Sequence, residues 1–193
     1  GAVLGLQREF INWEGPYLGY NIPGPYPVEN AIAELKATGL VGIANGKAEF
    51  GPRALGNRSL LADPRGKDVK DKVNTVKRRQ EFRPFAPVIL EEHANEYFDG
   101  PVGPYMQYTS KCKHPEQFPA IAHIDNTSRV QTVNQQQHPG LYRLLKEWKK
   151  ETGCPMLLNT SLNIKGEPMV DTEEDATRWQ EEYGVTVLTK EQS

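Results

Sequence analysis

Arginine recurs in three short stretches of this 193-residue chain, residues 49–59 (EFGPRALGNRS), 77–87 (KRRQEFRPFAP) and 123–133 (HIDNTSRVQTV). The guanidinium group is always charged and presents a planar fork of N–H donors that suits phosphate and carboxylate oxygens. In the first two stretches the arginines stand beside glycine and proline rather than along solvated helices. The pattern predicts a pocket for a small molecule that carries several negative charges.

The first stretch has the composition of a phosphate-binding loop. Gly51 and Gly56 would let the backbone approach a ligand closely, while Arg53 and Arg58 would supply charge. The stretch has neither the GK(S/T) of a P-loop nor the GxGxxG of a dinucleotide-binding turn. A surface turn with solvated arginines explains this composition equally well.

The second stretch places Lys77 and Arg79 two residues apart, just before the stiff segment that holds Arg83 between Phe82 and Pro84. On an extended segment such positions face the same side and could clamp one phosphate chain. On a helix they would diverge by about 200°, and the pair would then be a basic helix end that complements the dipole. Under the clamp interpretation, replacing either cation weakens ligand binding and costs little stability.

A third group of polar residues, NTSLN at 159–163, follows the apolar run PMLL. Open α/β sheets place ligands at the carboxyl ends of their strands, where Asn159, Ser161 and Asn163 could donate to anionic oxygens. The alternative is an Asx or Ser turn that caps the strand.

His123 and Asp125 stand two residues apart in the last arginine stretch, but no third metal ligand has a suitable spacing. We therefore expect no metal site. A satisfied structural histidine is the favoured interpretation, with ligand contact as the alternative. Arg129 heads an expected strand and is better placed for an anion.

Helical and strand patterns interleave along the chain, which predicts an α/β or α+β fold with a mixed sheet. Gly39 and the pair Thr172/Asp175 supply a helix C-cap and a capping box. Residues 1–27, rich in glycine, proline and tyrosine, should form an irregular extension on a domain spanning 28–193 and follow a preceding element. We expect helices over residues 28–38, 66–78, 91–98, 140–153 and 172–184, and strands over 40–44, 87–90, 105–110, 129–133, 155–161 and 185–188.

The composition indicates one domain with a net charge of -2, so no global positive field favours nucleic acid or an anionic membrane. Cys112 and Cys154 have no metal-type spacing, and we expect both to be buried and reduced. Two reduced thiols indicate a cytoplasmic protein. Residues 1–10 lack the charged start and apolar core of a signal peptide, and no apolar run approaches about 20 residues, so we expect a soluble intracellular protein.

Four blocks, at residues 49–65, 76–89, 119–133 and 152–170, occur in the order found in one family. Together they resemble the C-terminal domain of NodU/CmcH-type O-carbamoyltransferases, which include nodulation-factor, cephamycin and tobramycin carbamoyltransferases. The resemblance implies a YrdC-like fold: a twisted, mixed open sheet with flanking helices and a basic concave face. It also implies that ATP and carbamoyl phosphate are converted into carbamoyl adenylate and pyrophosphate. Mg²⁺ is expected to accompany ATP, held largely by phosphates and water.

The family's Lys-x-Arg and Ser-x-Asn signatures fall on Lys77/Arg79 and Ser161/Asn163. With these as a guide we expect Lys77, Arg79 and Arg129 to be catalytic. The expected ATP and carbamoyl phosphate contacts are Arg53, Arg58, Lys77, Arg79, Arg83, His123, Arg129, Asn159, Ser161 and Asn163.

The resemblance further implies a partner: an ASKHA-type domain, absent from this chain, that transfers the carbamoyl group to a hydroxyl. A non-catalytic module that binds nucleotide or carbamoyl phosphate is the main alternative. A second alternative is an RNA-binding protein related to tRNA-modification enzymes. The acidic pI of the chain argues against this alternative.

Overall fold

The computed structural model describes residues 21–48, 56–77, 84–103, 109–163 and 170–191, so Arg53, Arg79 and Arg83 lie outside the described residues. The described helices are α2 (Val28–Thr38), α3 (Val69–Lys77), η1 (Glu91–His93), α4 (Ala94–Tyr97), α5 (Pro139–Thr152) and α6 (Glu173–Tyr183). The strands are β1 (Asn21–Ile22), β2 (Leu40–Ala44), β3 (Gly46–Lys47), β4 (Arg58–Ala62), β5 (Ala86–Leu90), β6 (Phe98–Asp99), β7 (Thr109–Cys112), β8 (Thr127–Arg129), β9 (Gln131–Val133), β10 (Met156–Ser161) and β11 (Val187–Leu188).

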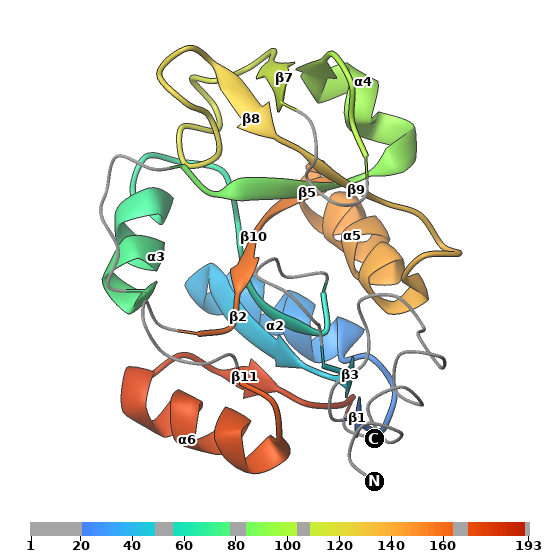
Figure 1. Cartoon of the computed structure of the whole chain (residues 1–193), viewed down its shortest axis with the longest axis vertical. Coiled ribbons are helices and arrows are strands. Elements are labelled where there is room, and N and C mark those ends of the chain that lie inside the picture. Colours follow the sequence, from blue (N-terminus) through green and yellow to red (C-terminus); the bar gives the residue numbers. More distant parts are fainter. Residues whose placement is uncertain (1–20, 49–55, 78–83, 104–108, 164–169, 192–193) are drawn as a thin grey trace, which may run out of the picture.

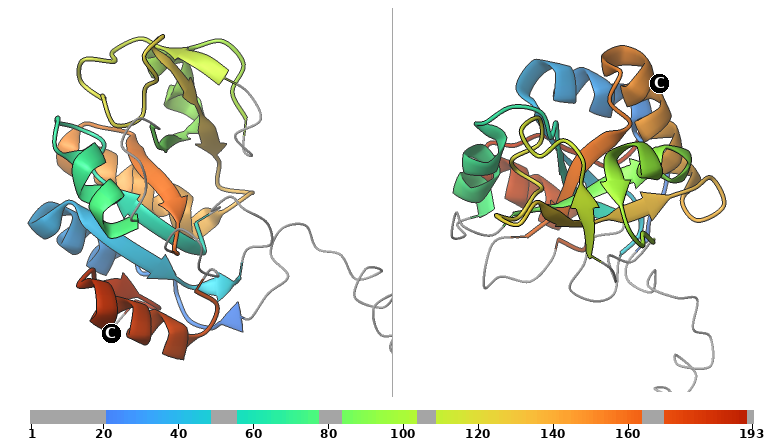
Figure 2. Two further views of the ribbon diagram at one scale, coloured as in Figure 1. Left: turned by 60° about the vertical axis from the view of Figure 1, so that its left-hand side comes forward. Right: turned by 90° about the horizontal axis from the view of Figure 1, so that it is seen from above.

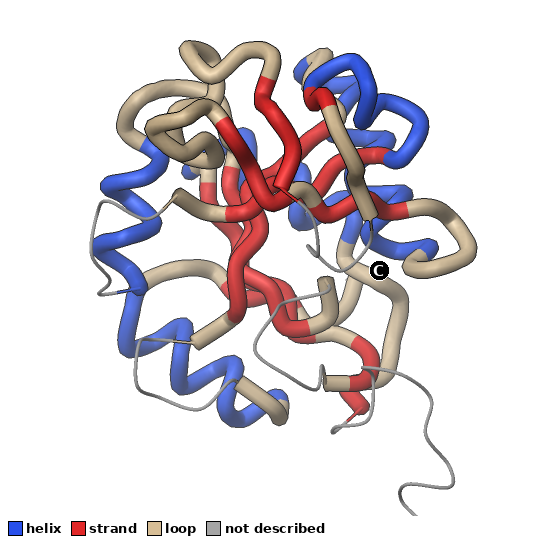
Figure 3. The backbone as a smooth tube through the Cα atoms, turned by 45° about the horizontal axis from the view of Figure 1, so that its top comes forward, coloured by secondary structure: helices blue, strands red, loops and turns tan. Residues whose placement is uncertain are grey.

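A six-stranded mixed sheet in the order β11-β2-β4-β10-β5-β9 forms the centre of the molecule (Figure 1). Neighbours from β2 through β5 are antiparallel, whereas the two outer pairs, β11–β2 and β5–β9, are parallel. In Figure 3 the strands run through the middle and the helices lie around them. The predicted α/β class with a mixed sheet is confirmed.

Side chains that alternate along the strands build two apolar clusters, one on each face of the sheet. On β4, Leu60 and Ala62 belong to one cluster and Leu61 to the other. Helices α2 and α5 contribute to the cluster of Leu61, while α3 and α6 contribute to that of Leu60. The large sheet is therefore covered by helices on both faces.

A smaller sheet, in the order β6-β7-β8, lies with α4 at one end of the molecule, and α6 lies at the opposite end (Figure 2). The strand expected over 129–133 is in fact two strands, because the backbone leaves the small sheet after Arg129 and joins the edge of the large sheet at Gln131. The buried residue between them, Val130, belongs to the first core cluster.

Several element boundaries differ from the sequence expectation. The helix expected over 66–78 begins at Val69, and the one over 91–98 divides into η1, α4 and β6. Strand β4 was not predicted at all, because its first residues were interpreted as a turn. Within residues 1–27, which were expected to be irregular, Asn21–Ile22 form β1 and pair with β3. In the part of the chain that the structure describes, no helix is long and apolar enough to cross a membrane.

The helix ends follow the sequence signals closely. Gly39, after α2, has a φ of 80° and donates its N–H to the Leu35 carbonyl, as a left-handed C-cap does. The capping box of α6 is present: Thr172 Oγ1 accepts from the Asp175 N–H, and the Asp175 carboxylate accepts from the Thr172 N–H.

Candidate functional site

Lys77, the last residue of α3, brings the second arginine stretch into contact with the end of β10. Its ammonium group donates to the Ser161 carbonyl oxygen at 2.6 Å, to Ser161 Oγ at 3.2 Å and to Asn163 Oδ1 at 2.7 Å. The residue is only 6% exposed. These three acceptors are neutral groups, and together they fix the position of the ammonium.

The segment from Ser161 to Asn163 forms a tight turn at this contact. Ser161 Oγ donates to Asn163 Oδ1 at 2.7 Å, and the Asn163 N–H donates to the Ser161 carbonyl at 3.0 Å. Asn163 Oδ1 therefore accepts from both the serine and Lys77, which fixes the side of the amide that faces the lysine. The turn expected as an alternative to ligand binding is present, and it leaves a ligand-binding role open to test.

Burial changes one expectation for Lys77. A surface cation can be removed at little cost, but this ammonium bridges a helix end and a strand end in the interior. Removing it leaves buried acceptors without their donor, which typically costs about 1–3 kcal/mol. We therefore expect replacement of Lys77 to lower stability as well as affinity.

The strand directions around the site differ from those of the parallel sheets on which the sequence argument relied. Strand β10 is antiparallel to both neighbours, so Ser161 pairs with Ser59 at the start of β4, and Asn159 pairs with Ala86 at the start of β5. The carboxyl end of one strand thus meets the amino ends of two others, because the fold alternates strand direction here.

The Arg58 guanidinium donates hydrogen bonds to backbone carbonyls inside the fold. Its side chain is fully buried, and Nη1 donates to the carbonyls of Asn45, Gly46 and Asn57 at 2.9–3.2 Å. Nε and Nη2 both donate to the Asp171 carbonyl, at 3.1 and 2.7 Å. The interpretation as a solvated arginine on a surface turn is wrong for Arg58, because the guanidinium ties β4 to the β2–β3 turn and to the segment before α6.

Asn159 is also buried, and its Nδ2 donates to Gln131 Oε1 at 2.7 Å. The bond links β10 to β9 across β5. Because the Asn159 amide is buried, its hydrogen bond to Gln131 stabilises the sheet.

The third stretch divides between the two sheets: β8, with Arg129, lies in the small sheet above β5 in Figure 1, and β9 lies at the edge of the large sheet. His123 is exposed, which argues against a satisfied interior histidine, and the neighbouring turn is closed by Asp125, whose Oδ1 accepts from the Thr127 N–H and Oγ1. These hydrogen bonds lower the pKa of Asp125. Arg129, at the end of β8, is exposed. Among the described residues, no three His, Cys, Asp or Glu side chains gather closely enough to hold a metal ion.

His138 is a polar residue that the sequence analysis missed. It caps α5: its Nδ1 accepts from the Leu141 N–H at 3.0 Å, which assigns the ring proton to Nε2, and Nε2 donates to Asn57 Oδ1 at 2.6 Å. Burial lowers the pKa of His138 to about 4, so the ring is neutral near pH 7. A histidine before Pro139 and an amphipathic helix is the sequence signal that could have identified this cap.

Tyr26 completes this connection between α5 and the end of the first arginine stretch. Its hydroxyl donates to the Gly56 carbonyl at 2.7 Å, and its ring packs edge-on against His138. Gly140 provides the space, because a Cβ there would lie 2.5 Å from Tyr26 Cγ. The start of β4, beside Ser161, is thereby anchored to the start of α5.

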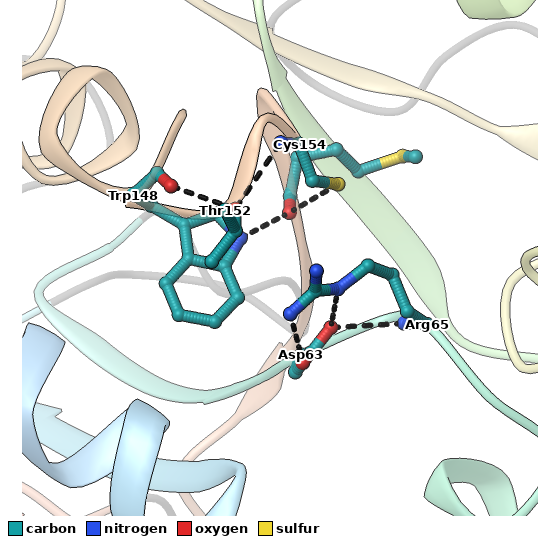
Figure 4. Close-up of polar contacts among 6 residues, drawn as sticks. Asp63, Arg65, Trp148, Thr152 and Cys154 are labelled. Carbon is teal, nitrogen blue, oxygen red and sulfur yellow. Dashed lines mark hydrogen bonds and ion pairs between the residues drawn. The ribbon is translucent and has the colours of Figure 1, made fainter. Parts of the chain in front are cut away.

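The opposite end of β4 and β10 is held by structural contacts (Figure 4). Arg65 donates from Nε and Nη2 to the Asp63 carboxylate at 2.9 and 2.8 Å, and its guanidinium lies over the Trp148 ring. Trp148 Nε1 donates to the Met156 carbonyl at 3.1 Å. Cys154 is buried beside it, and burial raises the pKa of its thiol to about 11. Such a thiol stays protonated and unreactive near neutral pH.

Comparison with known proteins identifies the family. The model of the carbamoyltransferase C-terminus matches residues 32–193, and the chain belongs to this family. It is 43% identical over 184 residues to the nodulation protein NolO of Bradyrhizobium diazoefficiens, covering 91% of this chain and 33% of that protein. It is 37% identical over 148 residues to the 3'-hydroxymethylcephem-O-carbamoyltransferase of Amycolatopsis lactamdurans, covering 76% of this chain and 28% of that enzyme. The chain thus spans about a third of the length of these curated relatives.

Two solved structures share the fold. Full-length HypF in its phosphate- and nucleotide-bound form superposes with a TM-score of 0.59 at 18% identity, covering 81% of this chain and 20% of HypF. HypF of T. kodakarensis gives a TM-score of 0.54 at 20% identity, covering 85% of this chain and 21% of that protein. At these identities the likeness shows the fold alone.

Proposed function

We propose that this chain is the part of an O-carbamoyltransferase that forms carbamoyl adenylate from ATP and carbamoyl phosphate. The observation that carries the proposal is the contact of Lys77 with Ser161 and Asn163, which joins the two signatures expected from the family at one point of the fold. Membership of the carbamoyltransferase family supports the reaction class.

The chemistry needs positive charge and exact placement more than a protein nucleophile. Hydrolysis of carbamoyl phosphate yields carbamate and inorganic phosphate. A carbamate oxygen then forms a bond to the α-phosphorus of ATP, and the bond from that phosphorus to the bridging oxygen breaks with release of pyrophosphate. Charge builds on the phosphate oxygens during this displacement, so a buried cation beside them stabilises the transition state.

Lys77 suits this role because it is held in advance by neutral acceptors and can exchange or share them when an anion arrives. The Asn163 amide nitrogen can add a neutral donor, and Ser161 Oγ can donate to a ligand when it releases its hydrogen bond to Asn163 Oδ1. We propose that Arg79, Arg83, Arg53 and Arg129 supply further charge around the phosphates. Arg58 and Asn159 instead hold the surrounding strands in position.

Mg²⁺ is expected to arrive with ATP. The described residues offer no cluster of acidic ligands, which suits an ion held mainly by phosphate oxygens and water. The ion would neutralise part of the triphosphate charge and help pyrophosphate to leave.

We further propose that transfer to the acceptor hydroxyl takes place on an additional ASKHA-type domain. The curated relatives are about three times as long as this chain, which is consistent with such a domain. A carbamoyl adenylate is a reactive mixed anhydride, and an adjoining domain would keep it from water before transfer. The two free, buried cysteines and the use of ATP favour the cytoplasm as its compartment.

The test is calorimetric titration of the chain with Mg-ATP and with carbamoyl phosphate, using Lys77→Met, which keeps most of the aliphatic stem. We expect Lys77→Met to weaken binding by about 1.5–3 kcal/mol, the range for hydrogen bonds to charged groups. Lys72→Met is the matched control, because Lys72 lies on the same helix and donates to the Thr38 carbonyl. Wild-type affinities for both ligands in folded Lys77→Met would refute the assignment.

A further inference from the structure

Asn74 on α3 is a buried amide without a hydrogen-bond partner among the residues that the structure describes. The residue is 4% exposed, and in the described part of the chain neither its Nδ2 nor its Oδ1 has a hydrogen-bond partner. Burying an amide without partners costs free energy, and native proteins contain few such groups. The partner that is missing can be supplied by a ligand.

The position of Asn74 ties it to the candidate site. It precedes Lys77 by three residues, and residues three apart lie on the same face of a helix. The Lys77 ammonium in turn contacts Ser161 and Asn163. The unpaired amide therefore lies on the same face of α3 as the cation expected to hold a phosphate.

The chemistry of the amide points to one part of the substrate. A carboxamide offers one acceptor and one pair of donors side by side. A carbamoyl group, H₂N–C(=O)–O, offers the complementary donor and acceptor on one edge, so the two groups can form a pair of parallel hydrogen bonds. A phosphate oxygen only accepts hydrogen bonds and would leave Asn74 Oδ1 unpaired.

We propose that Asn74 recognises the carbamoyl group of carbamoyl phosphate and of the carbamate derived from it, while Lys77 holds the phosphate. Asn74 is thus a specificity-determining residue, and this inference rests on the function proposed above. The amide is shielded from solvent, where each hydrogen bond discriminates more strongly between ligands than at a surface. An acyl group that lacks the amino function would leave the buried oxygen of Asn74 unsatisfied.

Competition between carbamoyl phosphate and acetyl phosphate tests the proposal, because the two differ at the group facing Asn74 and share the same phosphate. The wild-type chain is expected to prefer carbamoyl phosphate by about tenfold or more, the effect of one or two hydrogen bonds. Asn74→Ala should abolish the preference by weakening carbamoyl phosphate binding, with ATP and acetyl phosphate affinities within about twofold of wild type. Asn95→Ala, which removes an exposed asparagine on α4, is the control and should keep the preference.

Stability separates this role from a structural one. Asn74→Leu replaces the unpaired amide with an apolar group of similar shape, and should keep or raise the melting temperature while it abolishes the preference for carbamoyl phosphate. A clear fall in melting temperature would mean that the amide is paired within the fold, and would overturn the inference.

The ligand results distinguish this inference from the proposed function. Retention of the carbamoyl preference in folded Asn74→Ala overturns the role of Asn74 and leaves the proposed function standing. A wild-type chain that binds both phosphates equally, yet binds ATP, also refutes the specificity claim alone. A wild-type chain that binds neither ATP nor carbamoyl phosphate refutes both.

Discussion

Acid should weaken this fold through His138. The ring is neutral and buried at the start of α5, where Nδ1 accepts from the Leu141 N–H and Nε2 donates to Asn57. Protonation would turn Nδ1 into a donor facing that N–H and would place a charge in the interior. The folded chain therefore resists a proton that the unfolded chain accepts.

The size of the effect follows from the two pKa values. With a pKa of about 4 when folded and an ordinary value of 6.5 when unfolded, His138 favours folding fully above pH 6.5. This contribution is lost as the pH falls through the window from 6.5 to 4, because the unfolded chain binds more protons there. The loss amounts to about 2 kcal/mol at pH 5 and approaches about 3 kcal/mol below pH 4.

Urea unfolding at pH 5, 6, 7 and 8, on the wild type and on His138→Asn, measures the contribution. Asparagine is a good N-cap and does not titrate, so the variant should lose stability at pH 8 but depend less on pH, by about 2 kcal/mol between pH 8 and pH 5. His123→Asn removes an exposed histidine and should follow the wild-type pH dependence. Parallel curves for wild type and His138→Asn would refute the reasoning.

Two further substitutions test contacts that hold the site in place. Gly140→Ala forces a Cβ to within 2.5 Å of Tyr26 Cγ and should cost about 1–3 kcal/mol in urea unfolding, part of which Tyr26→Ala in the same chain should recover. An unchanged unfolding midpoint in Gly140→Ala would contradict this packing. Thr172→Ala removes the cap of α6 and should cost about 0.5–2 kcal/mol, while Thr172→Ser should retain most of the stability. Equal losses in both Thr172 variants would argue against the hydrogen bond to the Asp175 N–H.

Local signals predicted much of the fold. Helices α2, α5 and α6 were expected within a few residues of their observed ends, because apolar spacing and caps such as Gly39 act over short distances. The strand at β4 was missed because the burial of Arg58 depends on carbonyl groups of Asn45 and Asp171, which are remote in sequence. From sequence alone, a charged residue is predicted to be exposed, because its buried acceptors are not known.

The candidate site was predicted in part. The contact of Lys77 with Ser161 and Asn163 agrees with the family signatures, whereas spacing alone could not bring residues 84 positions apart together. The roles of the individual side chains in binding stay predictions. Asn74 was not predicted as a site residue, because a single asparagine in a helix has no sequence pattern that indicates a function. Its burial and its lack of partners among the described residues are known only from the structure.

Formation of carbamoyl adenylate is tested most directly by exchange of labelled pyrophosphate into ATP by the wild-type chain. We predict slow exchange that requires carbamoyl phosphate and is lost in Lys77→Met but kept in Lys72→Met. Binding of both ligands without any exchange would contradict it and indicate a non-catalytic binding module. Exchange that proceeds equally without carbamoyl phosphate would contradict the proposed carbamoyl adenylate.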